Sequence, residues 1–198
     1  MNAKGIRYVI VLSLFALALW QFASAGYIHV KAWLAQELIR SAWTQTEFNH
    51  QKVKPWSWAD TFPVARLKSD RVGLDLIVLA GTSGSTLAFG PGHLTGTASP
   101  GESGNVVISG HRDTHFENLK HVRIGDMFDL NTAEGDFKRY EVAEINVVDK
   151  STVEVAHDYG DDRLTLITCY PFDSTNYGGP LRYVVIAKPI SMHIVASQ

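Results

Sequence analysis

The sequence contains one cysteine and almost no net charge. Cys169 is the only cysteine in 198 residues, which excludes an internal disulfide and a CxxC metal site. Lys and Arg number 18 against 20 Asp and Glu, a formal net charge of -2, so a polycation that binds nucleic acid through its phosphates is excluded. Hydrophobic residues make up 45%, which argues against disorder. About 150 residues outside an apolar leader suffice to bury one core without disulfides.

Signatures of cofactor and metal binding are also missing. The glycine-rich segments 81–84 and 90–104 contain no Gly-Lys-Ser/Thr, and no GxGxxG opens a helix after a strand, so these segments are expected to be loops. His111, His115 and His121 have a spacing that fits no zinc-binding pattern, and no carboxylate nearby completes one. No cofactor and no metal are therefore expected.

A long apolar run lies near the amino terminus. Residues Tyr8 to Tyr27 carry no charge, and a helix of about 20 residues is about 30 Å long, which matches the hydrocarbon core of a bilayer. Lys4 and Arg7 precede the run, which predicts a cytoplasmic amino terminus and an extracytoplasmic body. The triplet 23–25, Ala-Ser-Ala, also resembles a signal-peptidase site, so a cleaved leader is the alternative to an anchor.

Three regions are expected along the chain. Residues 1–30 are a cytoplasmic tail and transmembrane anchor, 31–65 a juxtamembrane helix and connector, and 66–198 the catalytic domain. The juxtamembrane helix is expected over 31–51, since Trp33, Leu34, Leu38 and Trp43 approximate one helical face.

The catalytic domain is expected to be mainly β, because short β-rich runs alternate with Gly, Asp, Asn and Pro. Their number and spacing predict a small antiparallel barrel or sandwich. In the run 137–148 the apolar parity changes, which predicts a bulge near Ala143 and Glu144. The expected strands are Gly73–Leu79, Ser85–Phe89, Asn105–Ser109, Met127–Leu130, Phe137–Val148, Leu164–Cys169 and Leu181–Lys188.

A candidate site lies where three of these strands end. The alternating run Leu164–Cys169 ends at the thiol, and the next run begins at Leu181. If the two runs pair as a hairpin, Cys169 and Arg182 are cross-strand neighbours, about 5 Å apart. A third run, 105–109, leads through Gly110 into His111.

These residue types suit nucleophilic catalysis. The thiolate is the reactive form of cysteine, and a nearby cation such as Arg182 favours it. The same guanidinium would bind an oxyanion, and His111 would protonate a leaving amine. The alternatives are a buried structural cysteine, a solvated histidine and a surface arginine.

The segment Thr165-Leu166-Ile167-Thr168-Cys169 resembles the TLxTC signature of sortases, cysteine transpeptidases of bacterial surfaces. Gly110-His111-Arg112 upstream, Arg182 downstream and the apolar amino terminus occur in the order of that family. Lys54-Pro55-Trp56 with Ala59-Asp60 resembles the Gram-negative, proteobacterial subgroup. The resemblance covers about residues 50 to 190.

This resemblance implies a closed eight-stranded sortase barrel after a transmembrane helix and a juxtamembrane helix. It implies that Cys169 attacks a Thr-Gly bond in a C-terminal sorting signal of the Leu-Pro-x-Thr-Gly type in a secreted protein. His111 would act as acid and then base, Arg182 would hold substrate and oxyanion, and Thr168 would help position substrate. The chain would sit in the inner membrane with its catalytic domain in the periplasm, and the resemblance leaves the acceptor amine unidentified.

Two other functions are compatible with the same residues. One is a periplasmic Cys-His peptidase of another kind, although papain-like enzymes place Cys before His in the chain, whereas here His111 precedes Cys169. The other is a membrane-tethered binding module in which Cys169 only packs.

Overall fold

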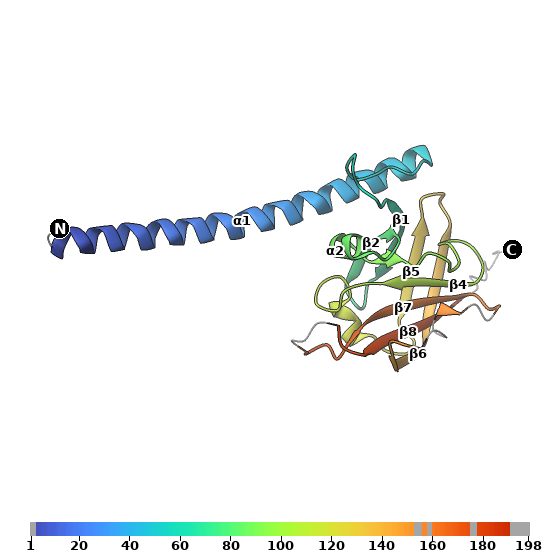
Figure 1. Cartoon of the computed structure of the whole chain (residues 1–198). Helices are drawn as coiled ribbons and strands as arrows, with labels where there is room; N and C mark the ends of the chain where they lie inside the picture. Colours follow the sequence, from blue (N-terminus) through green and yellow to red (C-terminus); the bar gives the residue numbers. More distant parts are fainter. Residues whose placement is uncertain (1–2, 153–155, 158–159, 175–177, 191–198) are drawn as a thin grey trace. The chain divides into compact units, whose positions relative to one another are not determined.

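A computed structural model describes residues 3–152, 156–157, 160–174 and 178–190. The chain divides into two compact units, residues 1–38 and 39–198. The first contains most of the long helix α1 (Ala3–Asn49), and the second contains the end of that helix and all the strands (Figure 1).

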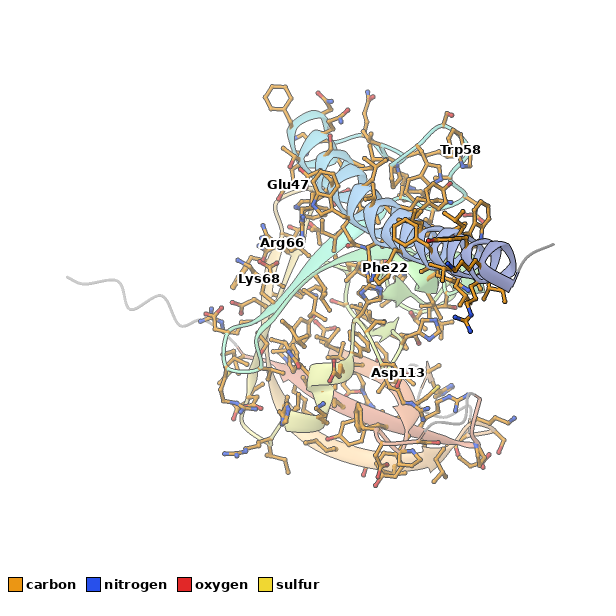
Figure 2. All side chains as sticks on the ribbon, turned by 90° about the vertical axis from the view of Figure 1, so that its left-hand side faces the viewer. Phe22, Glu47, Trp58, Arg66, Lys68 and Asp113 are labelled. Atoms are coloured by element: carbon orange, nitrogen blue, oxygen red, sulfur yellow. The ribbon has the colours of Figure 1, made fainter. Side chains whose placement is uncertain are left out.

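Helix α1 is long and apolar enough to cross a membrane, by its length and composition; a signal sequence has the same properties. Its apolar side chains are exposed, among them those of Leu12 and Trp20. Phe22, labelled in Figure 2, is 79% exposed. The two helical segments that the sequence predicts, at 8–27 and 31–51, form one continuous helix, which ends at Asn49, two residues before the predicted end.

The end of α1 that belongs to the second unit has one buried face. Ile39, Ala42, Trp43 and Thr46 are buried, and their i, i+3, i+4, i+7 spacing is that of an amphipathic helix. The face predicted from the sequence was only partly right, because Trp33 and Leu34 are exposed.

The second unit contains a closed eight-stranded barrel, as expected (Figure 1). The order of strands around it is β1-β2-β3-β4-β7-β8-β6-β5. Neighbours pair antiparallel except β2 with β3 and β4 with β7, which pair in parallel. The strands are β1 (Pro63–Ser69), β2 (Leu74–Ala80), β3 (Gly92–His93), β4 (Asn105–Ser109), β5 (Met127–Thr132), β6 (Phe137–Asp149), β7 (Arg163–Tyr170) and β8 (Leu181–Pro189).

The expected strand Ser85–Phe89 is wrong, because these residues form the short helix α2 (Gly84–Phe89). The Ser83 side chain caps this helix by accepting a hydrogen bond from the Thr86 N–H. A run of five residues is too short for its hydrophobic period to distinguish a strand from a helix, and here the capping residue favours the helix. A second helix, the 3-10 helix η1 (Glu117–His121), lies between β4 and β5.

Strand β1 starts inside the segment expected as a connector. Its pattern was visible in the sequence, since Ala65 and Leu67 are fully buried while Arg66 and Lys68 alternate with them. Figure 2 shows Arg66 and Lys68 projecting outward from β1. Arg66 donates to both carboxylate oxygens of Asp75 on β2.

The predicted bulge in β6 is confirmed. The register of β6 against β8 shifts between Val142 and Glu144. Before the shift Tyr140 and Val142 are buried, and after it Ile145 packs against the core. The extra residue therefore keeps apolar side chains on the inside along a strand of 13 residues.

The barrel interior is filled by alternate residues of every long strand. Leu164 and Leu166 of β7 meet Val185 and Ala187 of β8 there, and all four are fully buried. Residues between them point to the other face of the sheet, and this alternation decides where the candidate site lies.

Candidate active site

Cys169 lies at the end of β7 on the face away from the core. Because Leu164 and Leu166 point inward, Thr165, Ile167 and Cys169 point to the opposite face. The thiol is free and partly exposed. A thiol in such a position is accessible to a reactant, which a cysteine packed in the barrel interior is not.

Arg182 lies directly opposite Cys169 in the antiparallel β7–β8 ladder. This is the juxtaposition that hairpin pairing predicts. The Arg182 guanidinium is partly buried, and its Nη1 donates to the carbonyl oxygens of Gly179 at 2.7 Å and Leu181 at 2.9 Å. These bonds hold the cation at the start of β8, next to the strand end that carries the thiol.

His111 comes to the same place from β4. In the parallel β4–β7 pairing Ser109 lies beside Ile167, and the Gly110 N–H donates to the Ile167 carbonyl at 3.1 Å. His111 follows two residues after Ser109, just beyond the end of β4, and Cys169 lies two residues after Ile167, so both residues lie at this end of the paired strands. The His111 side chain is exposed. The structure thus brings His111, Cys169 and Arg182 to one end of β4, β7 and β8.

Gly110 is required by the packing beneath it. A Cβ built on Gly110 would lie 2.8 Å from the ring of Phe116, which is fully buried. The close approach of this aromatic ring is the physical reason for a glycine at this position. The Phe116 N–H donates to the His111 carbonyl at 2.9 Å, so the ring and the histidine belong to one tight loop.

Thr168 joins the histidine segment to the cysteine strand. Its side chain is 2% exposed, and its hydroxyl donates to the Gly110 carbonyl at 2.7 Å. Any influence of Thr168 on a substrate therefore passes through Gly110 and its neighbour His111.

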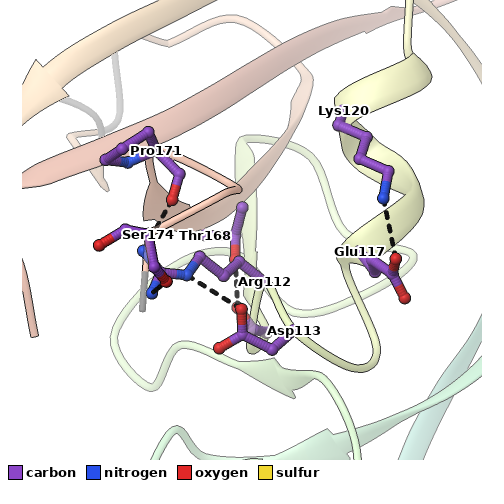
Figure 3. Close-up of polar contacts among 8 residues, drawn as sticks. Arg112, Asp113, Glu117, Lys120, Thr168, Pro171 and Ser174 are labelled. Atoms are coloured by element: carbon purple, nitrogen blue, oxygen red, sulfur yellow. Dashed lines mark hydrogen bonds and ion pairs between the residues drawn. The ribbon is translucent and has the colours of Figure 1, made fainter. Parts of the chain in front are cut away.

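Arg112 belongs to the Gly-His-Arg motif, but the sequence predicts no role for it. Its guanidinium is buried and donates to the carbonyl oxygens of Pro171 and Ser174, which follow the cysteine (Figure 3). The partners are backbone atoms far along the chain, and no side-chain pattern in the sequence indicates them.

His115 lies on the same loop as His111. Burial lowers the pKa of His115, and the nearby His111 lowers it further. The His115 imidazole is therefore neutral at pH 7, where its nitrogens include one donor and one acceptor.

No group of three or more His, Cys, Asp or Glu that could hold a metal ion occurs in the part of the chain that the structure describes. A pocket of about 640 Å³ lies where β2 ends and where the β5–β6 turn, Ala133 to Asp136, comes close. His93, Glu102 and Asp136 are among its lining residues, and His111, Cys169 and Arg182 are not. Strand β6 starts at this turn and its far end pairs with Arg182, the partner of Cys169, so the turn is at the other end of the barrel from Cys169.

Comparison with known proteins places this arrangement in a family. The sortase domain model matches residues 67–190. Sortase D of Bacillus subtilis (strain 168) is 33% identical over 128 residues, 63% of this chain and 63% of that protein. Sortase A of Bacillus anthracis is 28% identical over 110 residues, 54% of this chain and 51% of that protein. The chain thus spans about half to just under two thirds of these relatives.

A solved structure of a Clostridium perfringens sortase D5 transpeptidase has the same fold. It superposes with a TM-score of 0.63 at 24% identity, covering 79% of this chain and 96% of the other. The matched residues 67–190 contain the histidine, cysteine and arginine that the strands bring together, as well as nearly all of the barrel. This chain therefore belongs to the sortase family.

Proposed function

We propose that this protein is a membrane-anchored cysteine transpeptidase that cleaves a Thr-Gly type bond in the C-terminal sorting signal of a secreted protein. The observation that supports this most directly is the placement of its sole cysteine. Cys169 lies across the ladder from Arg182 on a face turned away from the core, and β4, which pairs with β7, ends two residues before His111.

The chemistry assigns one step to each residue. The Cys169 thiolate attacks the carbonyl carbon of the Thr-Gly bond, and a tetrahedral oxyanion forms beside the Arg182 guanidinium. The C–N bond then breaks, His111 donates a proton to the leaving amine, and a thioester remains on Cys169.

The second half-reaction reverses the roles. An acceptor amine attacks the thioester carbon while His111 takes the proton from that amine, and the C–S bond breaks to return the thiolate. When water replaces the amine the product is a carboxylic acid, so transfer and hydrolysis share the first half-reaction. Both halves need the imidazole beside the thiol, which the β4–β7 pairing supports.

The proposed location is the inner membrane, with one span, the amino terminus in the cytoplasm and the barrel in the periplasm. Helix α1 supplies an apolar segment of sufficient length, and Lys4 and Arg7 precede it. Labelling of intact cells with a membrane-impermeant thiol reagent tests this, since Cys169 is the only thiol. Labelling only after cell lysis would contradict the orientation, and a mass that lacks the first 25 residues would identify a cleaved leader.

The activity is tested with the full-length chain in detergent. The chain is incubated with peptides of the Leu-Pro-x-Thr-Gly type and hydroxylamine, and mass spectrometry is used to find a thioacyl adduct on Cys169 and a threonine hydroxamate. Both products should appear and both should be lost in Cys169→Ala. A thiol that alkylates readily but yields neither product with any peptide would contradict the proposed substrate class.

A further inference from the structure

Arg112 is a buried cation placed between the two segments that carry the proposed catalytic residues. Its side chain is 4% exposed. Nη1 donates to the Pro171 carbonyl at 2.7 Å, Nη2 donates to the Ser174 carbonyl at 2.6 Å, and Nε donates to Asp113 at 3.1 Å (Figure 3). The guanidinium thus uses three different nitrogens toward three partners.

Burying a guanidinium is costly unless its donors are satisfied. Two of its partners are backbone carbonyls, 59 and 62 residues further along the chain. A planar fork can reach both carbonyls at once, whereas a lysine ammonium presents a single point of charge on a flexible stem. The cation therefore holds the Pro171 and Ser174 carbonyls, which follow β7, in fixed positions.

We propose that Arg112 is a positioning residue that holds the chain leaving Cys169 against the chain leaving His111. This inference rests on the proposed function, because it takes Cys169 and His111 as the reacting pair. Arg112 is the next residue after His111, and Pro171 is the second residue after Cys169. A bond between these neighbours limits how far the imidazole and the thiol can separate.

A second brace makes the arrangement rigid. The Thr168 hydroxyl donates to the Gly110 carbonyl, one residue before His111 and one before Cys169. One brace alone would let the two segments pivot about it. With Thr168 on one side of the reacting pair and Arg112 on the other, the pair is held at two points, as a preorganised site requires.

The ion pair with Asp113 does not account for the burial of Arg112. Asp113 is 50% exposed and adjacent in sequence, and such pairs contribute only about 0–1 kcal/mol. The neighbouring 3-10 helix η1 contains an exposed pair of similar kind, in which Lys120 donates to Glu117 at 2.8 Å (Figure 3). Asp113→Asn and Lys120→Met are therefore suitable controls.

The test compares Arg112→Lys and Arg112→Ala with these controls in the full-length chain in detergent. We expect kcat for peptide transfer to hydroxylamine to fall by about 100-fold in both Arg112 variants, since a displacement of about 1 Å has an effect of that order. KM should stay close to the parent value, because Arg112 contacts no substrate. Guanidinium at a concentration that leaves the parent folded should restore part of kcat in Arg112→Ala but not in Arg112→Lys, with sodium chloride as the ionic control.

The outcomes separate this inference from the proposed function. A parent kcat in Arg112→Lys, or a loss equal to that of Lys120→Met, would overturn the positioning role. If the parent itself turns over no peptide, the proposed function fails. Two other measurements still report on the position of residues 168–174: the rate of Cys169 alkylation by iodoacetamide and the rate of amide exchange in this segment. If neither rate changes in Arg112→Lys, the inference is overturned. If Arg112→Ala does not fold, the judgement rests on Arg112→Lys.

Discussion

Cys169 and Arg182 are paired residues of neighbouring antiparallel strands, and Cys169 continues the row of Thr165 and Ile167 that points away from the barrel core. The backbone pairing brings the two residues together, and bonds from the Arg182 side chain to the Gly179 and Leu181 carbonyls hold its cation at the start of β8. The relation between the two residues is therefore as stable as the β7–β8 ladder, which is one of the most extensively paired in the barrel.

The first prediction concerns the reacting pair. Cys169→Ala should abolish transfer and leave the melting temperature unchanged, because the side chain is small and only partly buried. His111→Ala should lose nearly as much activity, since residues that act as one unit have non-additive effects. Near-normal rates in His111→Ala would remove its assigned role. His93→Ala is a matched control, because His93 lies on β3 at the pocket remote from Cys169.

The second prediction concerns Arg182. Arg182→Lys keeps the charge but cannot reproduce the planar arrangement of donors. We expect a loss in kcat of roughly 100-fold to 1,000-fold, the order of effect of one oxyanion donor. Steady-state kinetics with the most reactive peptide measures it. Full activity would show that charge alone suffices, and a bidentate role for Arg182 would then be excluded. Lys188→Arg, an exposed position on the same strand, serves as the control.

The third prediction concerns the glycine before the histidine. In Gly110→Ala the new methyl group would meet the buried Phe116 ring at 2.8 Å, so the loop that carries His111 must shift. Overpacking of this kind costs about 1–3 kcal/mol of unfolding free energy. The unfolding free energy, measured by denaturant titration, and kcat for transfer should both decrease. Gly84→Ala is the control, because its Cβ meets nothing within 4 Å.

The fourth prediction separates the brace at Thr168 from general stability of β7. Thr168→Val removes the donor to the Gly110 carbonyl, and Thr165→Val removes the donor to the Asn105 side chain on the other face of the same strand. Each should lower the unfolding free energy by about 1–3 kcal/mol. Only Thr168→Val should also lower kcat. Equal losses of kcat in the two variants would assign Thr168 a purely structural role.

The fifth prediction concerns acid stability. Asp126 is buried; burial raises its pKa, but hydrogen bonds from Arg71 and from the Arg123 N–H outweigh burial and leave the pKa below its ordinary value. A lowered pKa in the folded state contributes stability that is present above the unfolded value of about 3.9 and is lost as the pH falls through the folded value.

The unfolding free energy of the parent should therefore fall on acidification below about pH 4 more steeply than that of Asp126→Asn. Denaturant titrations at several pH values measure the two slopes. Parallel slopes would show that the Arg71 contact does not favour the charged carboxylate.

Much of the barrel and the meeting of three residues could be predicted from the sequence. Alternation in 137–148 and 164–169 decided the faces of β6 and β7, and the bulge followed from a change of parity. The Cys169–Arg182 contact followed from hairpin geometry, because antiparallel neighbours in sequence normally pair.

Other features depended on contacts that a linear pattern does not contain. Helix α2 depends on the Ser83 cap and on the burial of Thr86. Gly110 is required because the ring of Phe116, six residues further along, leaves no room for a Cβ atom. Arg112 is the clearest case, because arginine is normally a surface residue and its partners are carbonyl groups, which every residue has.

The parallel pairing of β4 with β7 has a consequence for how the protein is made. The segment that separates Ser109 from Arg163 contains β5 and β6, so β4 and β7 are neighbours in the barrel although they are far apart in the sequence. A chain that has been synthesised only as far as β6 lacks both Cys169 and Arg182. The three residues proposed to react therefore come together only once this long-range pairing has formed.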